Sequence, residues 1–266
     1  MALELLAQTL RERRRSLAWW SLGLGAMVAL NVAFYPSVQG SQGLSDYSKD
    51  LPEAMRALFA GGELDLASAT GYLNSQIFAL MAPLILLIFA IGFGASAVAG
   101  REERGTLDLL LAQPVRRESV VCQQFLALAT LVLALSAVLL CTVAIGSAVV
   151  DLEVGLDNLI AATLSVGMLT LLFASIALAM GAIWAGRARA AAVAAGLALA
   201  AWMLDGFAQA VPALEPWRFL SPYYQALGGG PLQHGADFGG LAILVALTGL
   251  VVTAGFFGLR RRDVRQ

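Results

Sequence analysis

The sequence is poor in charged residues and almost lacks the two side chains that most catalytic and nucleotide-binding sites require, histidine and lysine. Only 13% of its 266 residues are charged, against roughly 25% in a soluble domain. His234 is the single histidine, which argues against zinc-binding pairs and against a polytopic enzyme. Lys49 is the single lysine and belongs to no phosphate-binding loop, so ATP cannot bind by that route. Any driving energy therefore comes from a partner chain or an ion gradient.

Cysteine is also scarce. Cys122 and Cys141 are the only two, and both fall in one apolar run. If that run is a helix, their spacing separates them by about 28 Å, so they cannot form a disulfide with each other. We interpret them as small packing residues, and the sequence implies no disulfide framework.

Apolar residues, by contrast, make up 59% of the chain, and the mean hydropathy is +0.77. A helix needs about 20 apolar residues to cross about 30 Å of hydrocarbon. Six runs reach that length: 17–35, 74–99, 120–150, 159–185, 190–211 and 238–259. The sequence therefore predicts an all-α polytopic membrane protein of one transmembrane domain, 1–266, with six transmembrane helices.

The basic residues are distributed unevenly between the two sides that six spans define. One side carries Lys49, Arg56 and Arg218, and the other carries the remaining 14. These 14 are Arg11, Arg13, Arg14, Arg15, Arg101, Arg104, Arg116, Arg117, Arg187, Arg189, Arg260, Arg261, Arg262 and Arg265. The positive-inside rule then places both termini in the cytoplasm and makes 36–73 and 212–237 outer loops.

The N-terminal segment 1–16 is amphipathic. Its apolar face consists of Leu3, Leu6, Ala7 and Leu10, and a run of arginines follows. This pattern favours an interfacial elbow helix that lies on the inner membrane surface before the first span. The alternative is a solvated basic tail.

The stretch from Arg101 to Glu118 is the most informative one, because it concentrates charge between two apolar runs. Gly105 can end the preceding helix, Thr106 can cap a new one, and Pro114 stops it. Three leucines then share one face of that short helix: Leu107, Leu110 and Leu111. The segment is predicted to be a cytosolic helix that a partner protein can displace. The alternative is a charged loop that only fixes topology.

Two outer features carry polar or aromatic groups. Asp205 and Gln209 lie one turn apart near the outer end of the fifth span and are candidates for lining a substrate route. The alternative is that both simply sit at the outer interface. In the following loop, Ser221 can cap a short helix that begins with Pro222 and ends at Gly228.

The central motif Arg101-Glu-Glu-Arg-Gly-Thr-Leu-Asp-Leu-Leu-Leu-Ala-Gln-Pro-Val-Arg-Arg117 resembles that of the ABC-2-type permeases, the membrane subunits of a class of ATP-binding-cassette exporters. Asp108 stands where the family typically has glutamate. Ser221-Pro222 with its neighbouring tyrosines, Gly230-Pro231-Leu232 and the terminal Arg-Arg-Arg-Asp263 are also similar to the family. The six-span layout agrees over the whole chain.

The resemblance implies a permease that pairs with a second copy or a paralogue and docks two separate ATPase subunits. It assigns ATPase coupling to the 101–118 loop, at Glu102, Glu103, Arg104, Gly105, Thr106, Leu107, Leu110 and Leu111. It assigns an outer gate to Ser221, Pro222, Tyr223 and Tyr224. It also implies that ATP and magnesium are bound on the partner and that this chain binds no cofactor or metal, catalyses no reaction itself and contacts no nucleic acid.

Substrate identity is not encoded in any motif. The scarcity of charge in the spans favours a hydrophobic or amphiphilic cargo such as a drug, an antibiotic or a lipid, and composition favours a bacterial inner-membrane location. A second hypothesis from another class is a non-transporting membrane scaffold or maturation factor that recruits a cytosolic ATPase or other partner. It is motivated by the same lack of intramembrane charge.

Overall fold

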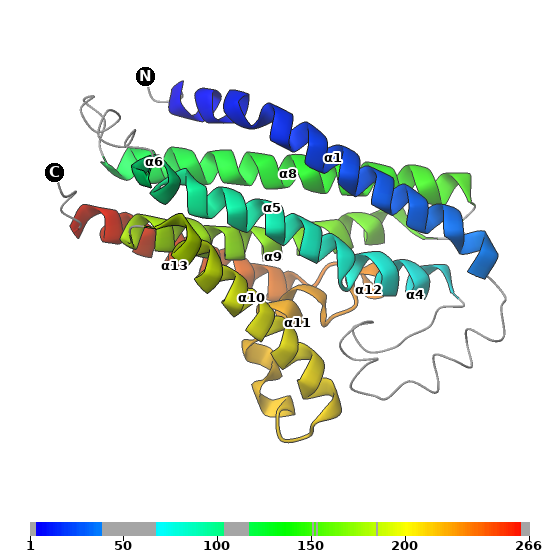
Figure 1. Cartoon of the computed structure of the whole chain (residues 1–266). Coiled ribbons are helices and arrows are strands. Elements are labelled where there is room, and N and C mark those ends of the chain that lie inside the picture. The colour runs from blue at the N-terminus through cyan, green and yellow to red at the C-terminus, as the bar shows by residue number, and fades with distance from the viewer. Residues whose placement is uncertain are drawn as a thin grey trace.

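The computed structural model describes residues 4–38, 68–103, 117–150, 152, 154–184 and 186–261, and the helices in these ranges form one elongated bundle (Figure 1). No strand occurs in these ranges. Six of the helical segments are long and apolar enough to cross a membrane. They are Leu6–Ser37, Ala69–Ala97, Val120–Val149, Leu156–Ile183, Arg187–Ala210 and Phe238–Leu259. The predicted all-α, six-span architecture is therefore confirmed.

The first helix, α1, runs without a break from Glu4 to Val38. Residues 4–16 form its first turns, so no separate helix precedes the span, and the interfacial position of these turns stays a prediction. In Figure 1 α1 lies along α8 (Arg117–Val149). The face that it buries carries Leu24, Val28, Val32 and Tyr35, which recur at the spacing of a helix.

The second span is assembled from four short pieces. They are α4 (Ala69–Leu73), the π-helical turn η1 (Asn74–Phe78), α5 (Met81–Ala97) and α6 (Ala99–Glu103). Pro83 lies in the first turn of α5, where a missing amide proton costs no helical hydrogen bond. The span thus begins five residues earlier than the predicted 74–99, because α4 precedes η1.

The fourth span, α9 (Leu156–Ile183), is the central helix. It contacts α5, α8, α10 (Arg187–Ala210) and α13 (Phe238–Arg261). In the most apolar stretch of α9, 72% of the residues are buried, whereas 17% of the residues are buried in the corresponding stretch of the first span. Three short helices fill the predicted outer loop: η2 (Glu215–Leu220), α11 (Pro222–Leu227) and α12 (Pro231–His234). The predicted short helix after Ser221 is confirmed as α11.

Small residues allow the central helices to approach one another closely. A Cβ added at Gly94 of α5 would collide with the backbone carbonyl of Ala174 on α9. On the other side of α9, a Cβ at Gly255 of α13 would lie 3.2 Å from Ala179. Because lipid tails are as apolar as the helices, association in a membrane depends on such close van der Waals packing.

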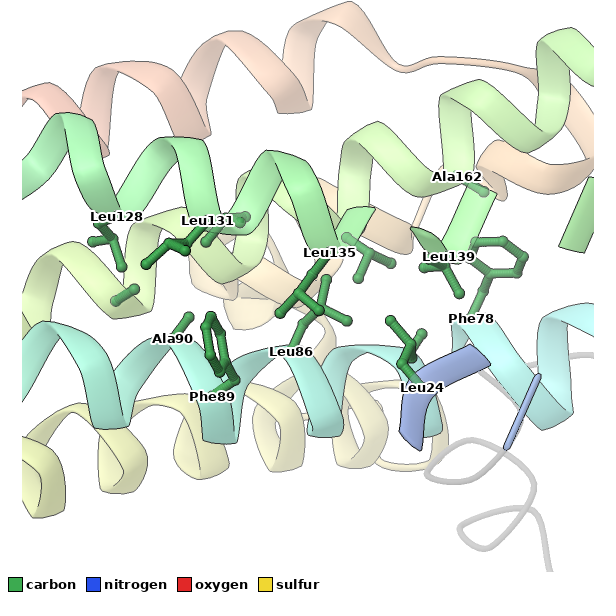
Figure 2. Close-up of a cluster of buried hydrophobic side chains, with 14 of the residues drawn as sticks. Leu24, Phe78, Leu86, Phe89, Ala90, Leu128, Leu131, Leu135, Leu139 and Ala162 are labelled. Atoms are coloured by element: carbon green, nitrogen blue, oxygen red, sulfur yellow. The ribbon is translucent and has the colours of Figure 1, made fainter. Parts of the chain in front are cut away.

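Large apolar side chains fill the space between α1, α5 and α8. Figure 2 shows Leu128, Leu131, Leu135 and Leu139 of α8 facing α5, from which Leu86, Phe89 and Ala90 extend. The N-terminal and C-terminal ends of the chain lie at the same end of the bundle, as six spans require, and α6 lies there too (Figure 1).

The close contact at Gly94 yields a direct prediction about stability. Gly94→Ala is expected to destabilise the protein by about 1–3 kcal/mol, because the added methyl group must displace a backbone carbonyl. The matched control is Gly92→Ala on the same helix, where nothing lies within 4 Å of the added Cβ. Thermal unfolding of the detergent-solubilised protein measures both, and equal melting temperatures for the two variants would contradict the packing argument.

Candidate functional site

The predicted coupling segment is attached to the bundle by α6. The backbone breaks at Val98, between α5 and α6, and α6 then ends at Glu103. Residues 104–116 lie outside the described residues, and so do the predicted coupling residues within them: Arg104, Gly105, Thr106, Leu107, Leu110 and Leu111. Glu102 is placed in α6. The structure therefore describes the stem of the coupling segment and the helices against which the stem packs.

Glu103 joins this stem to another span. Its Oε1 accepts a hydrogen bond of 2.7 Å from the backbone N–H of Arg187, the first residue of α10. The residue before it, Gly186, has no side chain that could cap the helix. The first amides of a helix have no partner within the helix, and the positive end of the helix dipole favours a carboxylate there. Glu103 therefore supplies from α6 the cap that α10 lacks.

A second set of polar contacts holds the first turns of α1 against the same stem. The Thr9 hydroxyl, only 3% exposed, accepts hydrogen bonds from Arg101 Nη2 at 3.0 Å and from Gln124 Nε2 at 3.3 Å. Arg13 Nη2 donates to Ser96 Oγ at 2.9 Å. These hydrogen bonds connect α1 with α5, with α8 and with the stem α6, at the end of the bundle where α1 begins and α13 ends.

The guanidinium of Arg13 also lies 5.2 Å from the centre of the Phe93 ring, and Arg101 Nη2 lies 4.0 Å from a carboxylate oxygen of Glu12. The sequence identified Arg13 only as one of the basic residues that set the topology, and Arg101 also as the start of the coupling segment. It missed the cluster because its members are separated by up to 115 positions along the chain. The available signal was Thr9, Glu12 and Arg13, which lie within one turn of one another in the amphipathic start of α1.

At the other end of the bundle, the predicted outer-gate residues form a well-packed junction. Ser221 is fully buried, donates from Oγ to the carbonyl of Ala201 at 2.7 Å, and accepts from the amide of Tyr223 at 3.2 Å. Pro222 occupies the first turn of α11. The Tyr223 ring lies 6.4 Å from the ring of Phe173 on α9. The Tyr223 phenol is buried, which raises its pKa above the usual value, so it stays neutral.

Asp205 also contacts this junction, whereas Gln209 contacts the backbone of Asp205. Asp205 Oδ1 accepts a hydrogen bond of 2.7 Å from Arg218 Nε in η2, and the two form a partly buried ion pair. Arg218 in turn lies 4.7 Å from the centre of the Tyr224 ring. Gln209 donates to the backbone carbonyl of Asp205 at 3.3 Å. The ion pair fixes η2 against α10, and the proposed role of Asp205 and Gln209 in a substrate route stays a prediction.

A groove of about 520 Å³ runs between α5 and α10. Its lining is almost entirely apolar and consists of Leu80, Leu84, Leu87, Ile88, Ile91, Gly92, Ala191, Ala192, Ala195, Ala198, Leu199, Trp202 and Tyr223. Its volume falls in the range of small-molecule sites, roughly 300–1,000 Å³. Tyr223 is the one predicted gate residue that lines it, while Asp205 and Gln209 do not. Such a surface can bind apolar molecules, and no cluster of metal-ligating side chains occurs in the described ranges.

A family model described as ABC-2 family transporter protein matches residues 3–264. The chain belongs to this family. No curated protein matches it. As an ABC-2 permease it is a multi-pass membrane subunit of an ABC transporter, and the ATPase activity resides in separate subunits with which it partners. In this ABC-2 permease, the α6 stem thus lies between the predicted ATPase-docking segment and α10, one wall of the apolar groove.

The Glu103 cap can be tested in this permease by hydrogen exchange. In Glu103→Ala the amides at the start of α10 are expected to exchange at least about threefold faster, because the Arg187 N–H loses its acceptor. Glu103→Gln keeps an acceptor oxygen and is expected to retain most of the protection. Exchange of peptides covering 187–192, read by mass spectrometry, measures this, and unchanged rates in the alanine variant would rule out the cap.

Proposed function

We propose that this chain forms, with a second copy or a paralogue, a permease that exports a hydrophobic or amphiphilic substrate when two ATPase subunits close beneath it. The observation that carries the proposal is the hydrogen bond between Glu103 and the first amide of α10. It connects the stem of the predicted coupling segment directly to a helix that lines the apolar groove.

The proposed mechanism begins at the 101–118 segment, which would dock on the ATPase. A displacement of that segment reaches α6, and Glu103 transmits it to the N-terminal end of α10, because a capped helix end moves with its cap. The Thr9 hydroxyl also joins the stem to α1 and α8, so these helices receive the same displacement at their ends. The consequence is a change in the width of the groove between α5 and α10.

The nature of the groove supports the choice of cargo. Its polar lining is negligible, so it offers an apolar molecule a dry surface but offers a charged one no counter-charge. The groove opens along the helices and is bordered by exposed Leu84, Ile88 and Leu199. An apolar substrate could therefore enter from the bilayer itself. The positive-inside pattern supports placing the coupling end in the cytoplasm. The outward direction of transport rests on the resemblance of the 101–117 motif to that of exporters, and the bacterial location rests on composition.

Docking of an ATPase is tested by co-expression with the proteins encoded by the neighbouring genes. The wild-type chain is expected to co-purify with a P-loop subunit and to show ATP hydrolysis. Gly105→Pro, which distorts the start of the predicted coupling helix, is expected to remove co-purification while membrane insertion persists. Gly43→Pro in the predicted outer loop is the control. If the wild-type chain brings down no ATPase, or if Gly105→Pro binds it fully, the coupling assignment fails.

The transport route is tested by filling the groove. Ala195→Trp places an indole in the apolar groove and is expected to reduce efflux of a transported fluorescent hydrophobic dye by about tenfold or more, because the binding surface is occupied. Ala200→Trp, which lies on the same helix outside the groove lining, is the control and is expected to transport like wild type. Dye accumulation in cells expressing the complex measures efflux by both variants, and equal efflux by the two would contradict this route.

The scaffold alternative has a separate test. Dye-stimulated ATP turnover by the complex in liposomes would exclude it.

A further inference from the structure

A second groove, of about 410 Å³, lies between α8 and α9 and shares no residue with the α5–α10 groove. It extends from Ala129 to Leu140 on α8 and from Ile160 to Leu171 on α9. Most of its lining is apolar, and exposed Leu133, Ile160 and Leu164 border it. The proposed function assigns this surface no role.

Two hydroxyl groups distinguish this groove from ordinary lipid-facing surface. Ser136 and Thr163 both line it, are 7% and 5% exposed, and have no hydrogen-bond partner among the described residues. A buried hydroxyl without a hydrogen-bond partner costs free energy, and the cost is larger in hydrocarbon, where no water can serve as the partner. Ser136 lies against Gly167, one turn from Thr163, so the two hydroxyls are near one another.

Other hydroxyls of the spans show that the lack of partners is specific to this place. Six of them donate to the backbone carbonyl one turn earlier in their own helix, which is the usual solution in a membrane helix. They are Thr130, Thr142, Thr170, Ser175, Thr248 and Thr253. Ser136 and Thr163 could in principle do the same, yet their hydroxyls have no hydrogen-bond partner among the described residues.

The length of the groove selects between a lipid-like molecule and a partner helix. Twelve residues of helix cover about 17 Å, roughly half of the about 30 Å of hydrocarbon that a spanning helix would have to follow. A helix of a partner would need an interface along the whole span. A chain about as long as one leaflet, bearing an oxygen that can accept hydrogen bonds, matches both the length and the two donors.

We propose that the α8–α9 groove is a binding site for a neutral amphiphile dissolved in the bilayer, an acyl chain with ester or carbonyl oxygens, which accepts hydrogen bonds from Ser136 and Thr163. The apolar chain lies along Leu133, Leu140 and Leu164, and its oxygens lie near the middle of the span. The site is independent of the ATPase and of the α5–α10 route. Occupancy satisfies the two hydroxyls and fills the space between the helices.

The experiment uses the full chain in phosphatidylcholine nanodiscs and two photoactivatable probes of equal chain length, a diacylglycerol with a diazirine in one acyl chain and a diazirine alkane without oxygen. Labelled peptides are mapped by mass spectrometry. We expect the diacylglycerol to label 129–140 and 160–171 of the wild-type protein, with at least about fivefold more labelling than the alkane, because only the ester oxygens accept the hydrogen bonds.

Variants then test the hydroxyls. Ser136→Ala with Thr163→Val is expected to bring diacylglycerol labelling down to the level of the alkane. The control, Thr142→Val with Ser175→Ala, removes one threonine and one serine hydroxyl from the same two helices, both of which donate to their own backbone. It is expected to label like wild type. Ala137→Trp, which fills the groove from an exposed position, is expected to remove labelling by both probes.

Three results would overturn the proposal. Equal labelling of the wild-type protein by the two probes means that the groove takes hydrocarbon without regard to oxygen, and this comparison needs no variant. Unchanged labelling in the hydroxyl-free variant excludes the two donors. Capture of a transmembrane partner by a photo-crosslinker at Leu133 in cells, with no lipid labelling in nanodiscs, assigns the groove to a helix instead. Loss of ATPase binding would leave all three comparisons unaffected. Failure of the proposed function can therefore be distinguished from failure of the α8–α9 groove proposal.

Discussion

The structure depends most on the close approach of α5 and α9, where the backbone of Gly94 lies directly against the carbonyl of Ala174. In a bilayer the solvent is as apolar as the side chains, so helices are held by contact area, and small residues at the crossing maximise it. This contact makes α9 the centre, and α8, α10 and α13 pack around it. The two apolar grooves lie beside this pair, one between α5 and α10 and the other between α8 and α9.

Polar contacts between helices lie at both ends of the bundle. At the end with both termini, Thr9 accepts from two helices and Glu103 caps a third. The bond between Glu103 and the Arg187 amide is exposed, so its net contribution to stability is modest. Its main effect here is directional, because it defines which helix follows the coupling stem. The opposite end is ordered by the Asp205–Arg218 pair and by Ser221, which attach η2 and α11 to α10.

Much of this architecture was predictable from sequence, and particular residues show why. The six spans were found because hydrocarbon thickness imposes a length of about 20 residues. The helix after Ser221 was found because a capping hydroxyl, a proline and a terminal glycine are local signals. Segment 1–16 was predicted as an interfacial elbow helix, since a run of arginines follows its apolar face. The structure shows residues 4–16 as the first turns of α1, where Thr9 and Arg13 form hydrogen bonds with residues of three other segments, and the interfacial position stays a prediction.

The sequence by itself determined what each segment must be: helical, spanning or exposed, and without the residues needed to bind ATP. These properties depend on neighbouring residues and on the solvent, and both can be deduced from the chain. The partnerships were decided only by tertiary structure. Nothing local indicates that Glu103 caps α10, that Asp205 binds Arg218, or that Tyr223 lines a groove. Nor does anything local indicate that Ser136 and Thr163 line the other groove without a hydrogen-bond partner among the described residues. Such relations arise from the crossing positions of helices, which the packing of Gly94 and its neighbours sets.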